Sequence, residues 1–115
     1  MKLKTVCIIC ARSGSKGIKN KNLKLVDGKP LIFYPIKAAQ MSGIIDNIIV
    51  STDSKKISSY AKKIGAEVPF LRPKKLSGDL TTTEATLKYS LLKYEEIKNQ
   101  KFDICVFLTA TDIFR

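Results

Sequence analysis

Four short runs of apolar and β-branched residues recur along the chain, at residues 5–10, 47–51, 67–71 and 104–108. Each run is nearly continuous rather than alternating, which is typical of a strand buried on both faces. Between the runs lie glycine-rich, polar or amphipathic stretches. The pattern therefore predicts four strands of one sheet that is covered on both sides.

Three of the intervening segments predict helices. Residues 31–41 have a broad apolar face, and Pro35 fits only in a first turn, so regular helix is expected from about residues 32–34. Asp53-Ser54 offers an N-cap to a helix that Gly65 ends. The T-x-x-E spacing of residues 81–84 predicts a capped helix to about Lys98. Residues 27–30, Asp-Gly-Lys-Pro, predict a turn.

Strands that alternate with helices indicate a three-layer α/β domain with a mostly parallel sheet. In such sheets ligands bind beyond the carboxyl ends of the strands. The polar motifs of the chain begin at those ends: Arg12 after the first strand, Asp53 after the second, Arg72 after the third and residues 109–115 after the fourth. We therefore expect these groups to meet at one edge and form a site.

The net charge of +11 favours an anionic partner such as a nucleotide, a nucleic acid or a phospholipid surface. The alternative is that lysines scattered over helix faces only solvate the protein. No run is long enough to span a membrane, and the start of the chain lacks an export signal, so a cytoplasmic protein is expected.

The three cysteines include a formal C-x-x-C pair, Cys7 and Cys10. Residues an odd number apart on a strand point to opposite faces, so these two thiols are not expected to bind one metal ion. We interpret them and Cys105 as small core residues in a reducing compartment. The chain has no histidine, which argues against histidine acid–base catalysis in this segment.

The stretch CARSGSKGIKNKN, residues 10–22, follows the first strand. It matches neither of the common phosphate-loop patterns. Gly14 and Gly17 would let backbone N–H groups approach a phosphate, while Arg12, Lys16 and Lys21 would neutralise its charge. A basic turn without a ligand is the alternative interpretation.

This stretch and the later motifs GKPLI, IIVSTDS, RPKKLSGD and TTTEATL resemble, in order and spacing, the N-terminal half of the acylneuraminate cytidylyltransferases. The resemblance implies a Rossmann-like nucleotidyltransferase topology that stops after the fourth strand, with residues 1–115 as the CTP-binding part. It also implies transfer of CMP from CTP to the anomeric hydroxyl of an acidic sugar, sialic acid or a related nonulosonic acid, with release of pyrophosphate.

The resemblance also implies roles for individual residues. Arg12, Ser15 and Lys16 would contact the CTP phosphates, with Arg12 and Lys16 as catalytic cations. Asn22 would lie near the nucleotide, and Arg72, Thr81 and Thr83 near the cytidine portion. A helix-capping role for the threonines is compatible with this. For Asp53 we favour helix capping over metal ligation, and the roles of Asp79 and Asp112 stay open.

Two features depart from the family pattern. The family carries a segment like LQPTSPLR after the fourth strand, whereas this chain reads LTATDIFR, so Thr109 replaces the glutamine expected near the sugar. The chain also stops at about half the usual family length. The carboxylates that hold Mg²⁺ and the segment that forms a homodimer would belong to the other half, and no metal ligand is expected in this chain.

Three alternatives remain open from the sequence. The same chemistry could act on another sugar acid, such as a pseudaminic, legionaminic or Kdo-like substrate. The chain could be an inactive truncated fragment. It could also be a module that binds nucleotides or nucleic acid without catalysis, although the lack of aromatic-rich basic strands disfavours nucleic acid.

Overall fold

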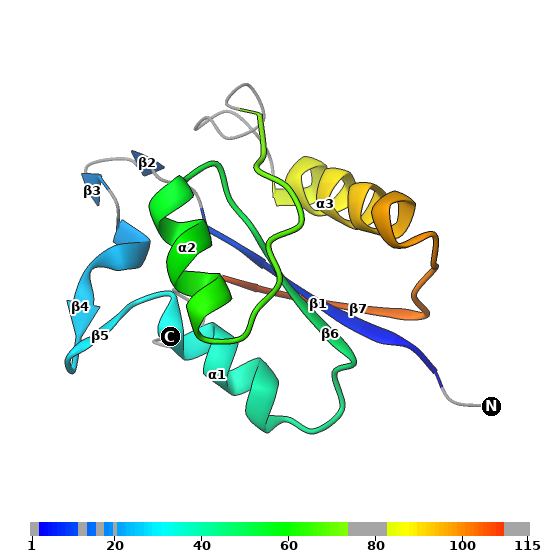
Figure 1. The fold of residues 1–115 in the computed structure, drawn as a ribbon, viewed down its shortest axis with the longest axis horizontal. Coiled ribbons are helices and arrows are strands. Elements are labelled where there is room, and N and C mark those ends of the chain that lie inside the picture. The colour runs from blue at the N-terminus through cyan, green and yellow to red at the C-terminus, as the bar shows by residue number, and fades with distance from the viewer. Residues whose placement is uncertain (1–2, 12–13, 16–17, 20, 74–82, 110–115) are drawn as a thin grey trace.

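The computed structural model describes residues 3–11, 14–15, 18–19, 21–73 and 83–109, and for residues 14, 15, 18, 19, 21 and 83 only the backbone is described. The elements are, in chain order, β1 (Thr5–Cys10), β2 (Gly14–Ser15), β3 (Ile18–Lys19), the 3₁₀ turn η1 (Lys21–Leu23), β4 (Leu25–Val26), β5 (Lys29–Pro30), α1 (Phe33–Met41), β6 (Asn47–Ser51), α2 (Lys55–Lys63), α3 (Thr83–Lys98) and β7 (Ile104–Thr109). Figure 1 shows their arrangement.

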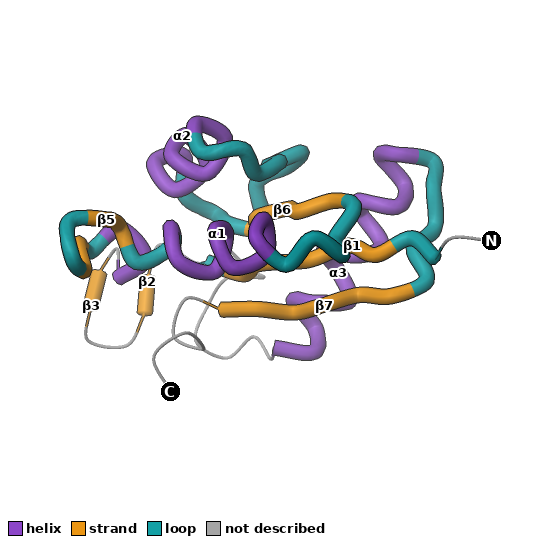
Figure 2. Tube along the Cα trace, turned by 90° about the horizontal axis from the view of Figure 1, so that it is seen from below, coloured by secondary structure: helices purple, strands orange, loops and turns teal. Residues whose placement is uncertain are grey.

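The central sheet has the strand order β6-β1-β7, and both pairings are parallel. β1 lies in the middle, as Figure 2 shows, and its first five residues are buried. In the register, Cys10 lies beside Ser51 of β6 and beside Thr109 of β7. The three strands therefore end level with one another at one edge, as the sequence pattern predicts.

Helices cover both faces of the sheet, with α1 below and α3 above the crossing strands in Figure 1. On one face, α1 and α2 pack on a core that includes Cys7, Ile9 and Val50. On the other face, Tyr94 of α3 packs with Val6, Ile8 and Ile49. Successive residues of β1 thus enter opposite cores, which explains why the strand sequence is continuously apolar. The predicted three-layer α/β class is confirmed.

The predicted strand at residues 67–71 is wrong over most of its length. Among the described residues, only two isolated parallel bridges pair this segment with the chain of β6, Ile49 with Glu67 and, just beyond the end of β6, Thr52 with Leu71. Pro69 between them has no N–H to donate, so a continuous ladder cannot form there. The segment nevertheless runs along β6, because the Glu67 carbonyl accepts from Val50 N at 2.9 Å and Thr52 O accepts from Arg72 N at 2.8 Å.

The three predicted helices are present, and α1 contains Pro35 in its first turn. The N-cap of α2 is Ser54, whose Oγ accepts a hydrogen bond from Ile57 N at 3.2 Å. This corrects the capping role expected of Asp53, one residue earlier. Gly65 follows α2 with a φ of +103°, a conformation that L side chains rarely adopt, so glycine is required at this helix end.

Two small hairpins were not predicted, one within the basic stretch and one just after it. β2 pairs with β3, and β4 pairs with β5, both antiparallel. The β4–β5 turn lies within the predicted 27–30 turn, where Asp27 and Gly28 have φ values of 51° and 80°. Positive φ at both central residues is typical of the tightest hairpin turns, for which Asp-Gly is a preferred pair.

The cysteine predictions are confirmed in part. Cys7 belongs to the core beneath α1 and α2, whereas Cys10 packs against the core beneath α3, so the two thiols lie on opposite faces. Cys105 is exposed, contrary to the expected core position, because β7 is an edge strand. The described residues contain no group of three or more His, Cys, Asp or Glu suited to a metal ion. Among them, too, no helix has the length and apolar character needed to cross a membrane.

Candidate functional site

Three described segments that carry or adjoin predicted site residues meet at the carboxyl edge of the sheet. Ala11 N donates to Ser51 O at 3.0 Å just beyond β1, and Arg72 N donates to Thr52 O just beyond β6. Thr109 ends β7 beside Cys10. The convergence expected from the strand ends is therefore present for each of these segments. Ligand sites of parallel α/β sheets lie at such an edge.

Arg72 is a buried charged residue at this edge, with 5% of its surface exposed. Burial raises the pKa of the neighbouring Cys10 thiol to about 11, although the positive charge of Arg72 acts to lower that pKa. Cys10 is therefore a neutral thiol at physiological pH. A buried guanidinium is costly to desolvate, and it presents a planar set of donors that suits carbonyl, carboxylate or phosphate oxygens.

Asn22 is also buried, with 7% of its surface exposed. It lies in η1, and its carbonyl accepts a hydrogen bond from Ile32 N at 2.9 Å. A second bond, from Leu31 N to Lys24 O, ties the same segment to the residues before α1. The chain that follows the basic stretch is therefore anchored to the protein at the start of α1.

Within the basic stretch, the structure shows a short hairpin. Gly14 is in register with Lys19, and Ser15 with Ile18. Residues 16 and 17, between the two strands, lie outside the described residues.

Arg12, Lys16 and Thr81, together with Asp79 and Asp112, lie outside the described residues. For Ser15, Lys21 and Thr83, only the backbone is described. The structure thus places three of the predicted site residues with their side chains, Asn22, Arg72 and Thr109.

Hydroxyl groups at the same edge were missed by the sequence analysis. Thr52 is fully buried, and its Oγ1 accepts from Ser54 N at 3.1 Å. Ser51, also fully buried, has its Oγ 2.6 Å from the Oγ of Ser90 in α3. A serine at the end of an apolar strand and another within the apolar face of a helix were the available signals. Their contact joins residues 39 positions apart, which local patterns do not reveal.

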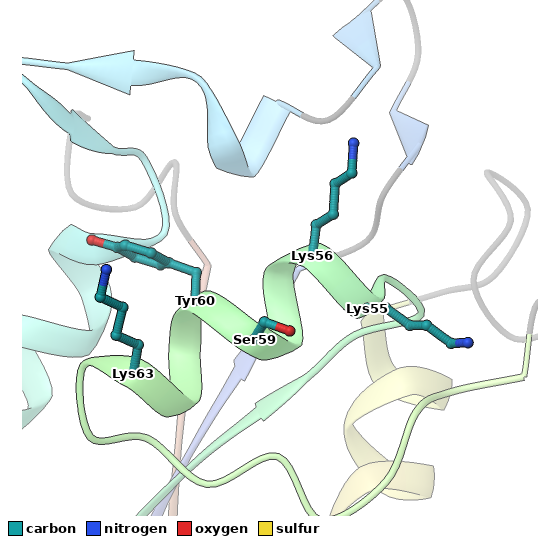
Figure 3. A pocket seen from close by; sticks show the side chains of 5 residues that line it. All are labelled: Lys55, Lys56, Ser59, Tyr60 and Lys63. Carbon is teal, nitrogen blue, oxygen red and sulfur yellow. The ribbon is translucent and has the colours of Figure 1, made fainter.

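A shallow pocket of about 440 Å³ lies along α2 and is lined by Lys55, Lys56, Ser59, Tyr60 and Lys63. Figure 3 shows Lys56 and Lys63 extending from the same side of the helix. The lysines make this surface attractive to anions. Among the residues that the structure describes, none of the predicted site residues lines this pocket.

Comparison with known proteins identifies a family. A family model described as cytidylyltransferase matches residues 6–111. The chain is 42% identical over 106 residues to a CMP-N,N'-diacetyllegionaminic acid synthase of Campylobacter jejuni, a match that covers 92% of this chain and 45% of that protein. It is 44% identical over 115 residues to an N-acylneuraminate cytidylyltransferase of Streptococcus agalactiae, covering 98% and 26% respectively.

A solved structure shares the fold. It is CMP:2-keto-3-deoxy-manno-octonic acid synthetase complexed with CTP, with a TM-score of 0.71 and 20% sequence identity. The match covers 93% of this chain and 40% of that one. The predicted nucleotidyltransferase topology is confirmed by this likeness. The chain spans less than half the length of each of these proteins.

Proposed function

Because the chain belongs to the cytidylyltransferase family, we propose that its protein transfers CMP from CTP to the anomeric hydroxyl of an acidic sugar of the nonulosonic class. The hydroxyl oxygen forms a bond to the α-phosphorus, and the bond from that phosphorus to the bridging oxygen breaks. Pyrophosphate leaves with the electron pair, and the hydroxyl proton is released. The family match across residues 6–111, which includes every strand end at the carboxyl edge, is the observation that carries the proposal.

The proposed roles follow from the resemblance of the sequence motifs to those of the family. Arg12 and Lys16 would neutralise the charge that develops on the phosphates, and Ser15 and Lys21 would bind the same triphosphate. Such a reaction depends chiefly on positioning and charge stabilisation, because the sugar hydroxyl attacks phosphorus directly and no nucleophile of the protein is needed.

On the nucleoside side, Asn22 and Arg72 would bind the nucleotide; both are buried, and Arg72 follows the strand edge directly, which supports its role. Thr81 and Thr83 would contact the cytidine portion. Thr109 ends β7 level with Cys10 and would face the sugar.

The Mg²⁺ ion expected from the resemblance finds no matching ligand set in the described part of the chain, where no group of three or more His, Cys, Asp or Glu could hold a metal ion. No step of the proposed reaction is therefore assigned to a metal. A cytoplasmic location is proposed because Cys7, Cys10 and Cys105 are all free thiols, as is usual in a reducing compartment. A homodimer remains a prediction that the molar mass in solution tests.

The test is CTP-dependent pyrophosphate release by the intact protein with a panel of acidic sugars, namely sialic, legionaminic, pseudaminic and Kdo-like acids. We expect release with CTP and a nonulosonic acid, and little with ATP. The sugar that gives the highest kcat/KM identifies the substrate. Binding of CTP without pyrophosphate release would instead support a non-catalytic nucleotide-binding module. No binding of CTP would contradict the proposal.

Lys16→Ala tests the proposed phosphate-binding role of residues 10–22 directly. Removing a charge-assisted contact to the triphosphate should lower kcat/KM for CTP by about tenfold or more. Lys62→Ala is the matched control, because Lys62 is an exposed lysine in the last turn of α2. Equal activity of the two variants would remove Lys16 from the mechanism.

A further inference from the structure

A chain of buried hydroxyl contacts joins β6 to α3 close to the carboxyl edge. Ser51, the last residue of β6, and Ser90 of α3 are both fully buried, and their Oγ atoms are 2.6 Å apart. Ser90 Oγ also donates to the carbonyl of Thr86 at 2.8 Å. Because a serine has one O–H to donate, Ser51 must be the donor to Ser90. The contacts therefore run in one direction, from Ser51 to Ser90 to Thr86.

The remaining contact between α3 and the sheet is mostly apolar. Leu87, Leu91 and Tyr94 pack over Val6 and Ile8 on this face. Apolar packing has no preferred direction, so it permits small shifts of a helix along a strand. A hydrogen bond resists such shifts, because it weakens steeply as its length and angle depart from their preferred values. The Ser51–Ser90 contact is thus the directional anchor on the half of α3 nearest the carboxyl edge, and the Asn47–Tyr94 hydrogen bond is a second one, a helical turn further along α3.

This anchor lies where it can control the site. Ser51 is in register with Cys10, whose thiol is close enough to Arg72 to respond to its charge. Ser90 lies seven residues after the start of α3, which is about 10 Å along the helix axis. Holding Ser90 against Ser51 therefore sets where the first turn of α3, beginning at Thr83, lies relative to the strand ends.

We infer that the Ser51–Ser90 pair positions the N-terminal half of α3 against the strand edge, and so sets the affinity of the nucleotide subsite; this rests on the proposed function. Neither serine touches the substrate in this assignment. They are positioning residues, and their loss should raise the KM for CTP more than it lowers kcat, because the groups that carry the chemistry lie in the phosphate loop.

The test compares Ser51→Ala, Ser90→Ala and the double variant in the intact protein. Ser90→Ala leaves the buried Ser51 O–H without its acceptor and should lower the Tm, whereas Ser51→Ala leaves Ser90 its bond to Thr86 and should lower the Tm less. The double variant removes both hydroxyls, which can be nearly neutral for stability, yet it also lacks the anchor. We expect its Tm to return close to that of the wild type while its KM for CTP stays raised about fivefold or more, because small misplacements are costly to binding geometry.

Tyr94→Phe is the matched control. It also removes a buried hydroxyl from the face of α3 that packs on the sheet, but one turn further from the strand edge, at a group bonded to Glu67 and Asn47. We expect it to lower the Tm without raising the KM for CTP. A wild-type KM in the double variant, or an equal rise in Tyr94→Phe, would overturn the inference.

Hydrogen exchange of the free protein separates this inference from the proposed function. In the double variant, amides 87–90 of α3 should exchange about tenfold faster, while amides 95–98 stay unchanged, because local opening is confined to the half that has lost its anchor. If the wild-type protein turns over no CTP, the proposed function fails, and hydrogen exchange alone then tests whether the serine pair positions α3. Unchanged exchange at residues 87–90 would overturn the positioning role.

Discussion

Tyr94→Phe should destabilise the protein measurably, because the Tyr94 hydroxyl lies at the centre of a polar cluster. It donates to Glu67 Oε2 at 2.8 Å and accepts from Asn47 Nδ2 at 3.1 Å. Lys98 Nζ lies 3.3 Å from the other oxygen of Glu67. The ring itself is fully buried and stacks on Phe102, with centroids 5.6 Å apart. Phenylalanine would keep this stacking and remove only the hydrogen bonds.

The size of the expected loss in stability depends on how exposed Glu67, the acceptor, is to water. A hydrogen bond to a charged group contributes about 1.5–3 kcal/mol. The Glu67 side chain is 39% exposed, so water can partly replace the lost donor. We therefore expect the lower end, a loss of about 1.5 kcal/mol, which for a domain of this size lowers the Tm by about 6 °C.

The loss of stability caused by Tyr94→Phe should depend on pH. Burial acts to raise the pKa of Glu67, but hydrogen bonds from Tyr94, Asn47 and Lys98 outweigh it and hold the pKa below its ordinary value. A depressed folded-state pKa gives stability that is present above the unfolded pKa, about 4.3, and lost as the pH falls through the folded value. The effect of Tyr94→Phe should therefore shrink on acidification below about pH 4.

Urea denaturation followed by circular dichroism, at pH 7 and at pH 3, measures both effects. Tyr89→Phe serves as the control, because Tyr89 lies on the same helix but outside the cluster, edge-on to Phe70. A loss in Tyr94→Phe no larger than that in Tyr89→Phe would refute the reasoning. So would a loss that is the same at both pH values, since it would show that the charge of Glu67 plays no part.

Two further predictions concern a helix end and the thiols. Gly65→Ala should lower the free energy of unfolding by about 1–2 kcal/mol, because φ is +103° there and the new Cβ would lie 2.9 Å from Gln40 Nε2. Gly43→Ala is the control, because φ is +74° there but the space around the new Cβ is open. Urea denaturation should show a smaller loss of stability for Gly43→Ala. Cys105 is exposed, whereas burial raises the pKa of Cys7 to about 12. A thiol reagent at pH 8 should thus label Cys105 first in the folded protein; labelling of Cys7 at a similar rate would contradict the structure.

The parts of the fold that the sequence predicts well are those with two independent local signals. β1, β6 and β7 each combine a continuous apolar run with polar flanks, and α2 combines a helical period with a cap and Gly65. Residues 67–71 carry only the apolar run, and Pro69 interrupts their pairing with β6. The two small hairpins were missed because strands of two residues are too short to produce a periodic pattern.

The site was predictable only as far as topology allows. Parallel strands all end at one edge, so Arg72 and Thr109 could be assigned to one region without knowing any contact, whereas Asn22 was assigned only through the family resemblance. Contacts between residues far apart in the sequence could not be predicted in this way. Nothing near Ser90 in the sequence indicates that it meets Ser51, and nothing in the run ICVFL indicates that β7 is an edge strand that exposes Cys105. Such features depend on packing in three dimensions.

The segment from Glu67 to Arg72 connects the stability of the fold to its site. At one end, Glu67 is held by the cluster at Tyr94 and by hydrogen bonds to β6. At the other end, Arg72 N donates to Thr52 O, and the buried guanidinium lies at the strand edge. Five residues of extended chain span about 16 Å, far enough for substitutions at one end to leave the other in place. Since β6 pairs with both ends, loosening the Glu67 cluster should lower the free energy of unfolding while the Thr52 contact keeps Arg72 at the edge. The stability of the fold and the position of Arg72 are thus expected to be separable along a single segment.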